Sequence, residues 1–460
     1  MRETDHSIKI KQEITNIIEA SSPKQLQDSL TEYHPSDLAE AFQHLDDEQQ
    51  LFVLQSLNFH VLAELFEYLN DAKAVKYLNL LSNQKGANIL ETMEPDDAAD
   101  ILQKMKAQQS DDLYKIMHEE SRNVLKKLSA YKLHTAGAIM TTDFISLQRG
   151  MDIKDAMRHL IREASSTEGI QRLFVLDDKN FLHGAIELKN LIQARAPKTI
   201  DDIMYTDIIS VHIDDDVEEA ARLIQNYGIY VMPVVNDKNQ LQGVITMDDA
   251  ADILDEATDE DYAKFAGISG NIVLNDTLIR SALHRLPWLI LLLFLGLIIS
   301  TIISRFEETI DQIAVLVLFQ PLILDMAGNT GTQSLAVTVR GLSKNHFSLK
   351  GSTKKHLFKE LRVGMINGLT IGVISIITSL LFLTIVSPTM AIGTPLQVAL
   401  TVGISASIAL TFATLFGAFF PMFLTKIKVD PAVASGPFIT TLNDVIGLII
   451  YFTLAMLIIL

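Results

Sequence analysis

The chain has 460 residues, a formal net charge of −18 and no cysteine. Its length allows several domains, and without cysteine it can form neither disulfides nor thiolate metal sites. The balance of charged residues changes near residue 281. Before that point there are 27 Lys and Arg against 49 Asp and Glu, and after it there are 11 against 7. A strongly acidic first part repels nucleic acid and attracts cations, so we expect no nucleic acid among its partners.

Residues 1–133 show helical periodicity with weak repetition. Three segments share a short polar start followed by apolar residues at helical spacing: residues 34–45, 59–69 and 94–105. Pro35 and Pro95 stand near helix starts, where the missing N–H costs little. This pattern predicts an all-α domain in which short helices stack into a superhelix.

From about residue 134 short strands alternate with helices, and the pattern occurs twice. Met140 and Met204 are 64 residues apart, and each copy ends with an apolar strand, a polar turn, a second strand after glycine and a helix. The doubled α/β pattern resembles a tandem pair of cystathionine-β-synthase (CBS) domains, with copies over residues 134–198 and 199–254.

The CBS resemblance carries an expectation about adenine nucleotides. In that family a Thr hydroxyl and the carboxylate three residues later contact ribose and phosphate, which implies Thr246 and Asp249 here. The first copy has Glu187 and Asn190 at these places, so at most one nucleotide site per chain is implied. The alternative is a CBS pair that serves only for dimerisation.

Acidic residues of this first part gather in three runs, at residues 94–100, 213–219 and 247–262. For any single residue the simpler interpretation is a helix cap or a solvated face, because acids near a helix N-terminus are favourable anyway. Three runs brought together by folding would repel one another unless a cation neutralised them. The runs therefore predict a cytoplasmic divalent-cation switch, with an acidic connecting helix over residues 255–281.

The last part, residues 282–460, is predicted to be an all-α transmembrane domain with five spans. Five apolar runs are long enough to cross a bilayer: residues 286–303, 313–339, 363–386, 396–424 and 438–460. The second and fourth runs are interrupted by glycine, proline and polar residues.

The charges of the loops predict the orientation in the bilayer. Two loops, after the second and fourth spans, are basic through Lys344, Lys350, Lys354, Lys355, Lys359, Arg362, Lys426 and Lys428. By the positive-inside rule these loops and the N-terminal region lie in the cytoplasm and the C-terminus outside. The first residues of the chain lack the apolar run of a signal peptide, which agrees with a cytoplasmic start.

The second span contains the stretch QPLILDMAGNTGTQ, residues 320–333. One interpretation is a kinked helix in which Gly328 and Gly331 allow neighbouring helices to pack closely. The other is that residues 328–331 open the helix and present carbonyl and amide oxygens to a cation, as broken helices do in transporters.

The fifth span carries Asn443 and Asp444 inside an apolar run. Burying a carboxylate there costs roughly 2.5–3.5 kcal/mol on insertion scales, so such an acid usually marks an ion path. The alternative is a carboxylate hydrogen-bonded between helices, and Asp325 could simply reach polar backbone near the break. Oxygen ligands indicate a hard cation, of which Mg²⁺ suits a wide pore with retained waters, although Ca²⁺ and Mn²⁺ also bind oxygen.

The domain order, together with the motifs over residues 321–333 and 428–444, resembles the MgtE family of bacterial magnesium channels over essentially the whole chain. The resemblance implies a homodimer in the bacterial cell membrane that takes up Mg²⁺. Two Asp444 side chains would face each other in the pore and hold a largely hydrated ion, helped by Gly328, Asn329 and the backbone near Thr440.

The same resemblance implies that cytoplasmic Mg²⁺ locks the pore shut by binding between the soluble domains, with ATP as a further regulator. The regulatory ligands it implies are Asp97, Asp100, Asp214, Asp216, Glu218, Asp249, Asp252, Asp255, Glu256 and Asp259. Glu308 near the outer mouth and Asp430 before the fifth span are implied as peripheral cation sites.

Two other function classes stay open. A secondary exchanger could couple a divalent cation to protons or sodium; the predicted spans hold no histidine, which disfavours a proton relay. A membrane-anchored nucleotide or metal sensor would need neither Asp444 nor the glycine-rich stretch. No ATP-hydrolysing motif and no nucleophile–base pattern is present, so neither a pump nor an enzyme is expected.

Overall fold

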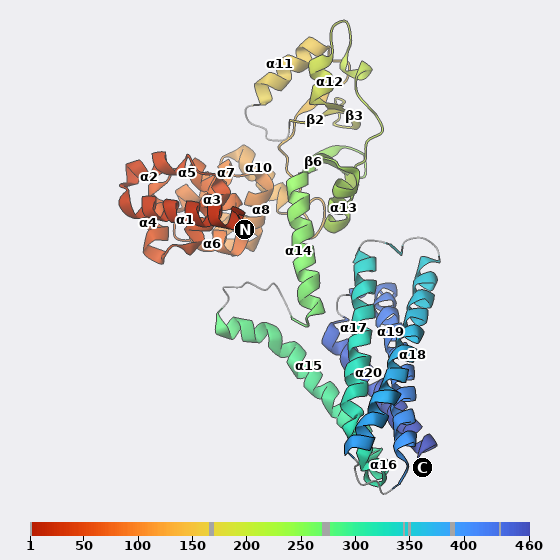
Figure 1. The fold of residues 1–460 in the computed structure, drawn as a ribbon. Helices are drawn as coiled ribbons and strands as arrows, with labels where there is room; N and C mark the ends of the chain where they lie inside the picture. The colour runs from red at the N-terminus through yellow and green to blue at the C-terminus, as the bar shows by residue number, and fades with distance from the viewer. Residues whose placement is uncertain are drawn as a thin grey trace. The chain divides into compact units, whose positions relative to one another are not determined.

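The computed structural model describes residues 2–164, 170–268, 277–343, 346–347, 351–386, 392–431 and 434–460. The chain forms two compact units, Met1–Asp255 and Glu256–Leu460. The first contains a helical domain and two small sheets, and the second contains the apolar helices (Figure 1). The predicted fold class, an all-α superhelix, an α/β CBS pair and a five-helix apolar domain, is confirmed.

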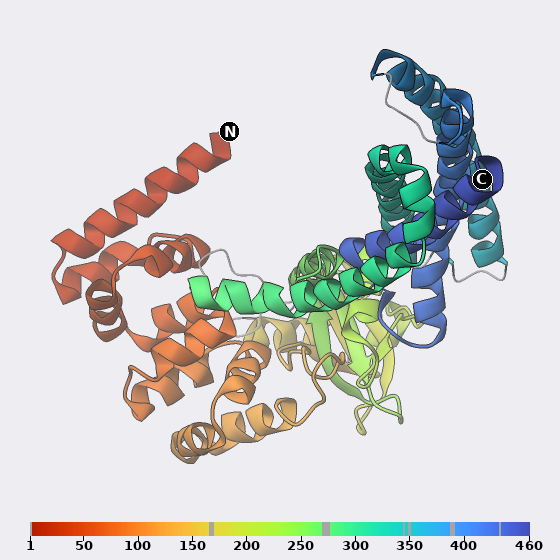
Figure 2. The same cartoon turned by 90° about the horizontal axis from the view of Figure 1, so that it is seen from below.

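Ten helices build the N-terminal domain, drawn in red to orange in Figures 1 and 2. They are α1 (Arg2–Ala20), α2 (Pro23–Leu30), α3 (Pro35–His44), α4 (Asp47–Ser56), α5 (Phe59–Glu67), α6 (Asp71–Leu78), α7 (Asn83–Thr92), α8 (Pro95–Lys104), α9 (Ala107–Ile116) and α10 (Glu119–Leu128). The helices form two rows in which each packs on the second helix after it in sequence. One row is α1, α3, α5, α7 and α9, and the other is α6, α8 and α10. This is the packing of a helical superhelix, because each helix covers the apolar face of its neighbour in the stack.

Local signals explain where these helices begin. Pro35 and Pro95 occupy the first turn of α3 and α8, as predicted. Asp46 accepts a hydrogen bond from the Gln49 backbone N–H at 2.8 Å and caps α4. Such caps satisfy N–H groups that the helix cannot pair itself.

The two CBS copies have the same topology. In the first, β1 (Ser146–Gln148) is parallel to β2 (Arg172–Leu176), which is antiparallel to β3 (Leu182–Glu187). In the second, β4 (Val211–His212), β5 (Val231–Val235) and β6 (Leu241–Thr246) repeat this order. The helices of the pair are α11 (Ile153–Glu163), α12 (Leu188–Gln193), the 3₁₀ helix η1 (Ile200–Asp202) and α13 (Val217–Tyr227).

Each sheet is extended by the segment that leads into the other copy. Thr141 pairs with Val244 of β6, and Tyr205 pairs with Ala185 of β3. A Cβ atom on Gly243 would lie only 2.6 Å from the Thr141 carbonyl oxygen, so the position requires glycine. The exchange of segments ties the two copies into one body.

A long helix, α14 (Met247–Phe265), follows β6. We expected a separate connecting helix over residues 255–281, but the helix after β6 continues without interruption to Phe265. No glycine or proline stands between Met247 and Phe265, and the helix ends just before Gly267, which has φ +71°. Residues 269–276 of the expected helix lie outside the described residues.

The second unit contains the five predicted apolar helices. They are α15 (Leu278–Ser304), α17 (Gln320–Ser343), α18 (Ser352–Val386), α19 (Pro395–Lys426) and α20 (Gly436–Ile458), with α16 (Glu307–Gln312) and the 3₁₀ helix η2 (Ala314–Leu318) before α17. Each is long and apolar enough to cross a membrane, the second together with η2. Helices α17, α19 and α20 pack on one another, α18 packs on α19, and α15 packs on α20.

Two expectations about these helices are corrected. The fourth run is not interrupted, because α19 is continuous from Pro395 to Lys426. The second run is divided at Phe319 between η2 and α17, and α17 then continues through its glycines. Gly and Pro are tolerated inside these helices because neighbouring helices pack against them. The spans are not free of histidine either. The candidate spans α15 and α18 begin before the apolar runs and include His284 and His356.

Candidate functional site

Helices α17 and α20 approach each other closely at the glycine-rich stretch. A Cβ atom on Gly328 would lie 2.7 Å from Thr440 Cγ2, and one on Gly331 would lie 1.9 Å from Asn443 Nδ2. A Cβ atom on Gly417 of α19 would lie 2.2 Å from the Gly331 carbonyl oxygen. The two glycines of α17 therefore allow side chains of α20 and the backbone of α19 to approach the α17 backbone closely.

The stretch does not open the helix. Residues 328–331 lie inside α17, where the Thr330 hydroxyl donates to the Met326 carbonyl at 2.7 Å and the Thr332 hydroxyl to the Asn329 carbonyl at 2.9 Å. Carbonyl oxygens engaged in this way are not presented to an ion. Of the two interpretations of the stretch, close packing is the one that the structure supports.

Asn443 and Asp444 lie on α20 at this level. Asn443 is only 1% exposed, and neither its Oδ1 nor its Nδ2 atom has a hydrogen-bond partner among the described residues. Asp444 is half-buried, and its Oδ1 atom likewise has no hydrogen-bond partner within the described part of the chain. Asp325 of α17 lies close enough to Asp444 for the two carboxylates to interact electrostatically. Buried polar groups of this kind are rare in membrane helices and mark functional sites.

The predicted pore residues are brought together only in part. Gly328 lies against Thr440, and Asp444 of the same helix α20 lies within electrostatic reach of Asp325. Asn329 instead faces a cavity of about 520 Å³ between α17 and α18. Its polar lining is Asn329, Thr330, Thr332, Gln333, Asn367 and Thr370. Among the described residues no three acids or histidines lie close enough together to hold a metal ion.

A second polar cluster joins α17 and α18. Glu360, only 6% exposed, accepts a hydrogen bond from the Ser334 hydroxyl at 2.8 Å, and the Thr338 hydroxyl and His356 Nε2 lie 2.9 Å apart. The sequence prediction missed His356 and Glu360, because the third span was expected to begin at residue 363. Ser334 and Thr338 lie within the predicted second span, where they were not singled out.

The first unit gathers acids from two helix N-termini. Asp96 and Asp97 lie in the first turn of α8, and Asp249 lies in the first turn of α14. The segment that pairs Thr141 with β6 brings the two helix starts together, and Asp96 and Asp249 repel each other. The N-terminus of each helix carries a partial positive charge that stabilises nearby carboxylates, which explains how the fold accommodates these acids.

The environment raises the pKa of each of these carboxyls. Burial, followed by repulsion from Asp249, raises the pKa of Asp96 to about 7. Burial and the charges of Asp96 and Glu67 raise the pKa of Asp97 to about 9. Burial also raises the pKa of Asp249, against the hydrogen bond from Thr246. Acids held this way bind protons or cations readily.

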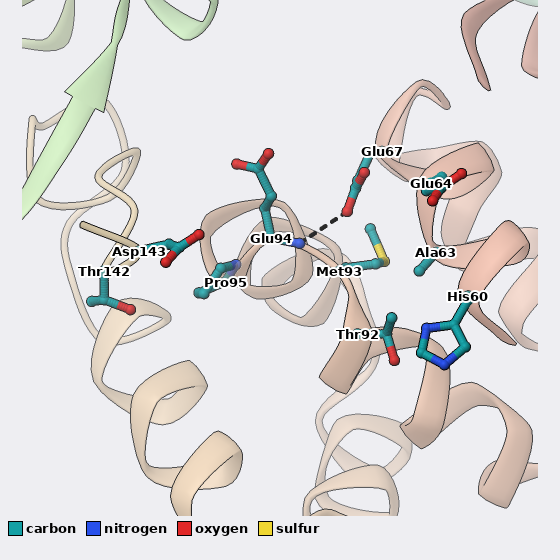
Figure 3. A pocket seen from close by; sticks show the side chains of 10 residues that line it. All are labelled: His60, Ala63, Glu64, Glu67, Thr92, Met93, Glu94, Pro95, Thr142 and Asp143. Atoms are coloured by element: carbon teal, nitrogen blue, oxygen red, sulfur yellow. Dashed lines mark hydrogen bonds between the residues drawn. The ribbon is translucent and has the colours of Figure 1, made fainter. Parts of the chain in front are cut away.

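An acidic pocket of about 430 Å³ opens next to this cluster (Figure 3). Its carboxylates are Glu64 and Glu67 of α5, Glu94 at the start of α8, and Asp143. Glu67 accepts a hydrogen bond from the Glu94 backbone N–H at 2.9 Å. Glu64, Glu67 and Asp143 lie outside the three acidic runs, so sequence reasoning missed them; only their positions in the folded domain bring them to the pocket.

Other predicted regulatory acids have local structural partners. Asp216 caps α13 by accepting hydrogen bonds from the Glu218 and Glu219 backbone N–H groups, and Glu218 pairs with Arg222 at 2.9 Å. Asp214 is exposed and lies 3.7 Å from His212. These partners match the simpler interpretation of the second acidic run.

The remaining predicted acids lie on α8, on α14 and in the second unit. The acids exposed on α14 are Asp252, Asp255, Glu256 and Asp259. Partial desolvation of the Asp252 carboxyl, followed by repulsion from Asp248 and Asp255, raises its pKa. Asp430 forms an ion pair with Lys264 at 2.6 Å. Burial lowers the pKa of Lys264, but hydrogen bonds to Asp430 and Glu260 outweigh it and raise this pKa to about 12. Glu308 is exposed on α16, and Asp100 lies on α8.

The proposed nucleotide residues contact each other. The Thr246 hydroxyl donates to Asp249, and the Thr246 backbone N–H donates to the same carboxylate at 3.3 Å. Both stand at the turn from β6 into α14, the position that the CBS resemblance assigns to ribose and phosphate.

Comparisons with known proteins cover both units. A family model described as "Divalent cation transporter" matches residues 320–454, one for the MgtE intracellular N domain matches residues 33–134, and the CBS domain model matches residues 136–197 and 200–256. The magnesium transporter MgtE of Bacillus subtilis is 38% identical over 339 residues, which are 74% of this chain and 73% of that protein. The magnesium transporter MgtE of Thermus thermophilus is 30% identical over 454 residues, 98% of each chain.

Solved structures match the first unit. The soluble part of a magnesium transporter aligns with a TM-score of 0.52 and 28% identity over 55% of this chain and 99% of that one. The cytosolic domain of the Mg²⁺ channel MgtE in complex with ATP aligns with a TM-score of 0.50 and 31% identity over 53% of this chain and 99% of that one. With one relative matched over 98% of both chains, another 38% identical over 74% of this chain, and family models matched in each part, the chain belongs to the MgtE family, a family of transporters and not of enzymes.

Proposed function

We propose that two copies of this chain form a Mg²⁺-selective channel that takes up magnesium across the cell membrane and is closed by cytoplasmic Mg²⁺. The observation that carries the proposal is the match to a magnesium transporter over 98% of the chain, which includes the acidic unit as well as the apolar helices. The proposed channel has four parts: the helical domain (1–133), the CBS pair (134–254), the connecting segment (255–281) and the pore domain (282–460).

Asp444 is the proposed ion-binding residue of the pore. It is half-buried on α20, whose side chains pack against the glycines of α17, and Asp325 is the acid within its electrostatic reach. A second copy would bring a second Asp444, and the two carboxylates would hold Mg²⁺ through its retained waters. Gly328, Asn329 and Thr440 would surround the ion. Such outer-sphere binding is weak enough for the ion to leave, as conduction requires.

The acids of the first unit are the proposed sensor. Ionised Asp96, Asp97 and Asp249 repel one another, and a divalent cation would remove that repulsion. Binding to the compact arrangement shifts the population toward it, which is how Mg²⁺ would close the pore. The implied ligands on α14, together with Asp100, Asp214, Asp216, Glu218, Glu308 and Asp430, belong to the same proposal.

An adenine nucleotide is the proposed second regulator. A similar cytosolic domain was solved in complex with ATP. In this chain Thr246 and Asp249 stand at the turn from β6 into α14, where the CBS resemblance implies contacts with a nucleotide. Because Asp249 also belongs to the acid cluster, a nucleotide there would change the affinity of the cluster for Mg²⁺.

The proposed orientation places the first unit in the cytoplasm. The family model for residues 33–134 describes an intracellular domain, and the loops after α17 and α19 are basic. Inward Mg²⁺ flux would then be driven by the membrane potential, about 2.3 kcal/mol per charge per 100 mV.

The test is Mg²⁺ current across excised membrane patches containing the full chain, with Mg²⁺ titrated on the cytoplasmic face. We expect a current that falls steeply as cytoplasmic Mg²⁺ rises, is lost in Asp444→Ala, and persists in Asp311→Ala, which removes an exposed acid on α16. Uptake that requires a proton or sodium gradient would instead indicate an exchanger. Absence of both current and uptake would indicate that the chain is a membrane-anchored sensor that transports no ion.

A further inference from the structure

Helices α18 and α19 leave an apolar groove of about 350 Å³ on one side of their contact. Its walls are Leu361, Met365 and Leu369 of α18 and Ile408 and Phe412 of α19, and its floor is Ser407 and Thr411. Met365, Leu369 and Phe412 are each about half or more exposed. The groove therefore faces outward from the helix pair along the length of about two helical turns.

Glycine makes the groove deep. A Cβ atom on Gly364 would lie 2.9 Å from Thr414 Cβ, and one on Gly368 would lie 2.4 Å from the Ser407 carbonyl oxygen. The Thr411 hydroxyl donates to the Gly364 carbonyl at 3.2 Å, which holds the two backbones together. The large wall residues thus stand on either side of a contact that contains only small side chains.

Basic residues continue the same face of α18 toward its N-terminus. At 100° per residue, Lys354, Phe358, Leu361, Met365 and Leu369 fall within a sector of about 80°, and Arg362 lies just beside it. The Arg362 guanidinium stacks over the Phe358 ring, 4.4 Å from its centroid. Lys359, by contrast, lies about 100° or more from most of this sector.

The facing helix repeats the arrangement. α19 runs antiparallel to α18, since Gly364 lies at Thr414 and Gly372 at Ser407 and Gly403. Helical spacing places four residues of α19 near its groove side: Phe412, Phe419, Phe423 and Lys426. Because the two helices are antiparallel, Lys426 at the end of α19 lies beside the start of α18. Among the described residues Lys354, Arg362 and Lys426 have no carboxylate within salt-bridge distance, so their charges are available to an anion.

We infer that this groove, defined by its wall and floor residues, is a binding site for an anionic phospholipid. One acyl chain lies between Leu361, Met365, Ile408 and Phe412, and the headgroup phosphate is held by Lys354 and Arg362. An apolar groove with positive charge at one end matches a lipid with an apolar chain and a negative head. A zwitterionic lipid would fill the groove equally well but would gain less from the basic end.

The test uses the single tryptophan of the chain, Trp288. In a Trp288→Phe background, Phe412→Trp places a reporter in the groove wall, and Phe294→Trp places the matched reporter on exposed α15. The full chain is reconstituted in vesicles that mix phosphatidylglycerol and phosphatidylcholine, with brominated acyl chains on one lipid at a time. Quenching of tryptophan by bromine measures which lipid occupies each position.

We expect the Phe412→Trp site to bind phosphatidylglycerol about tenfold more tightly than phosphatidylcholine, because two basic residues contact its headgroup. Brominated phosphatidylglycerol should therefore quench this reporter beyond its share of the vesicle. The Phe294→Trp reporter should follow the bulk composition. Replacing both Lys354 and Arg362 by Gln should abolish the preference, whereas Lys359→Gln, which removes the same kind of charge from another face, should keep it.

Three results would overturn the inference. One is quenching of Phe412→Trp in proportion to bulk composition, which indicates ordinary lipid contact. Another is an equal loss in the Lys359→Gln variant, which indicates attraction by the whole basic end. The last is no quenching by either lipid, which indicates that a second copy of the chain covers the groove.

Discussion

At the scale of single residues, the glycines of α17 have a packing role that a methyl group would destroy. Gly328 and Gly331 face Thr440 and Asn443 at distances that no Cβ atom could occupy. The cost of placing glycine in a helix, roughly 1 kcal/mol relative to alanine, is offset by the contact that it permits.

Gly331→Ala should therefore destabilise the second unit by about 1–3 kcal/mol, because the new methyl group must displace Asn443 or part the helices. Thermal unfolding of the detergent-solubilised chain measures the change. Gly296→Ala on α15 is the matched control, since no atom lies within 4 Å of its Cβ position and we expect no loss there. Equal melting of the two variants would contradict the packing role.

The buried acids of the first unit predict a dependence of stability on pH. Burial and mutual repulsion raise the pKa of Asp97 from its usual 3.8 to about 9, so the folded chain binds this proton more tightly than the unfolded chain does. Between about pH 4 and pH 9 the folded state therefore holds more protons, and stability falls as pH rises, by at most about 1.4 kcal/mol per pH unit.

Asp97→Asn should remove this part of the dependence, because an amide stays neutral at every pH. In metal-free buffer the stability advantage of Asp97→Asn over the wild type should grow steadily from about pH 4 to pH 9, as measured by thermal unfolding. Asp111→Asn, at an exposed position of α9, should show no such trend. A constant difference between Asp97→Asn and wild type across the range would mean that the Asp97 pKa is not raised.

At the scale of elements, the position of η2 depends on a side chain far along the sequence. The Tyr451 ring is fully buried on α20, and its hydroxyl donates to the Leu316 carbonyl at 2.9 Å. The Phe319 backbone N–H donates to the same oxygen at 3.1 Å. This bond connects the short 3₁₀ helix before α17 to the helix that carries Asp444.

Tyr451→Phe should cost about 1 kcal/mol, the net value of one hydrogen bond, because Phe319 continues to satisfy the carbonyl. Hydrogen exchange should become faster at residues 314–319 and stay unchanged in α18. Tyr230→Phe, at an exposed tyrosine, is the control and should change neither quantity. Unchanged exchange at η2 in Tyr451→Phe would show that the bond does not hold the segment.

At the scale of the whole molecule, we propose that two chains form the channel. Within one chain the described residues offer no group of three acids or histidines for a metal, and α15 buries none of its residues. A shared pore would supply the second Asp444 and give the chain a symmetric partner.

The shared pore predicts how mixed dimers behave. A covalent tandem of one wild-type and one Asp444→Ala copy should conduct far less than half of the wild-type tandem, because every pore would lack one of its two carboxylates. Single-channel recording in patches measures this directly. A tandem that keeps half of the wild-type conductance would indicate one independent pore per chain.

The sequence by itself determined the elements and their order. Hydropathy located five apolar helices, helical spacing located the stacked helices, and the repeated strand pattern located the two CBS copies, because each of these signals is carried by neighbouring residues. The sequence also marked Asp444 and the acids at residues 96–97 and 249, since charge in an apolar run or in a cluster is visible without a fold.

Only the tertiary structure decided what those residues contact. It placed Gly328 and Gly331 against α20 instead of opening α17, joined Asp96 to Asp249, and brought Glu67 beside Asp97. It also extended α18 back to Ser352, which put Glu360 against Ser334. These contacts join residues far apart in the chain, and their distances depend on how helices pack, which no local pattern encodes.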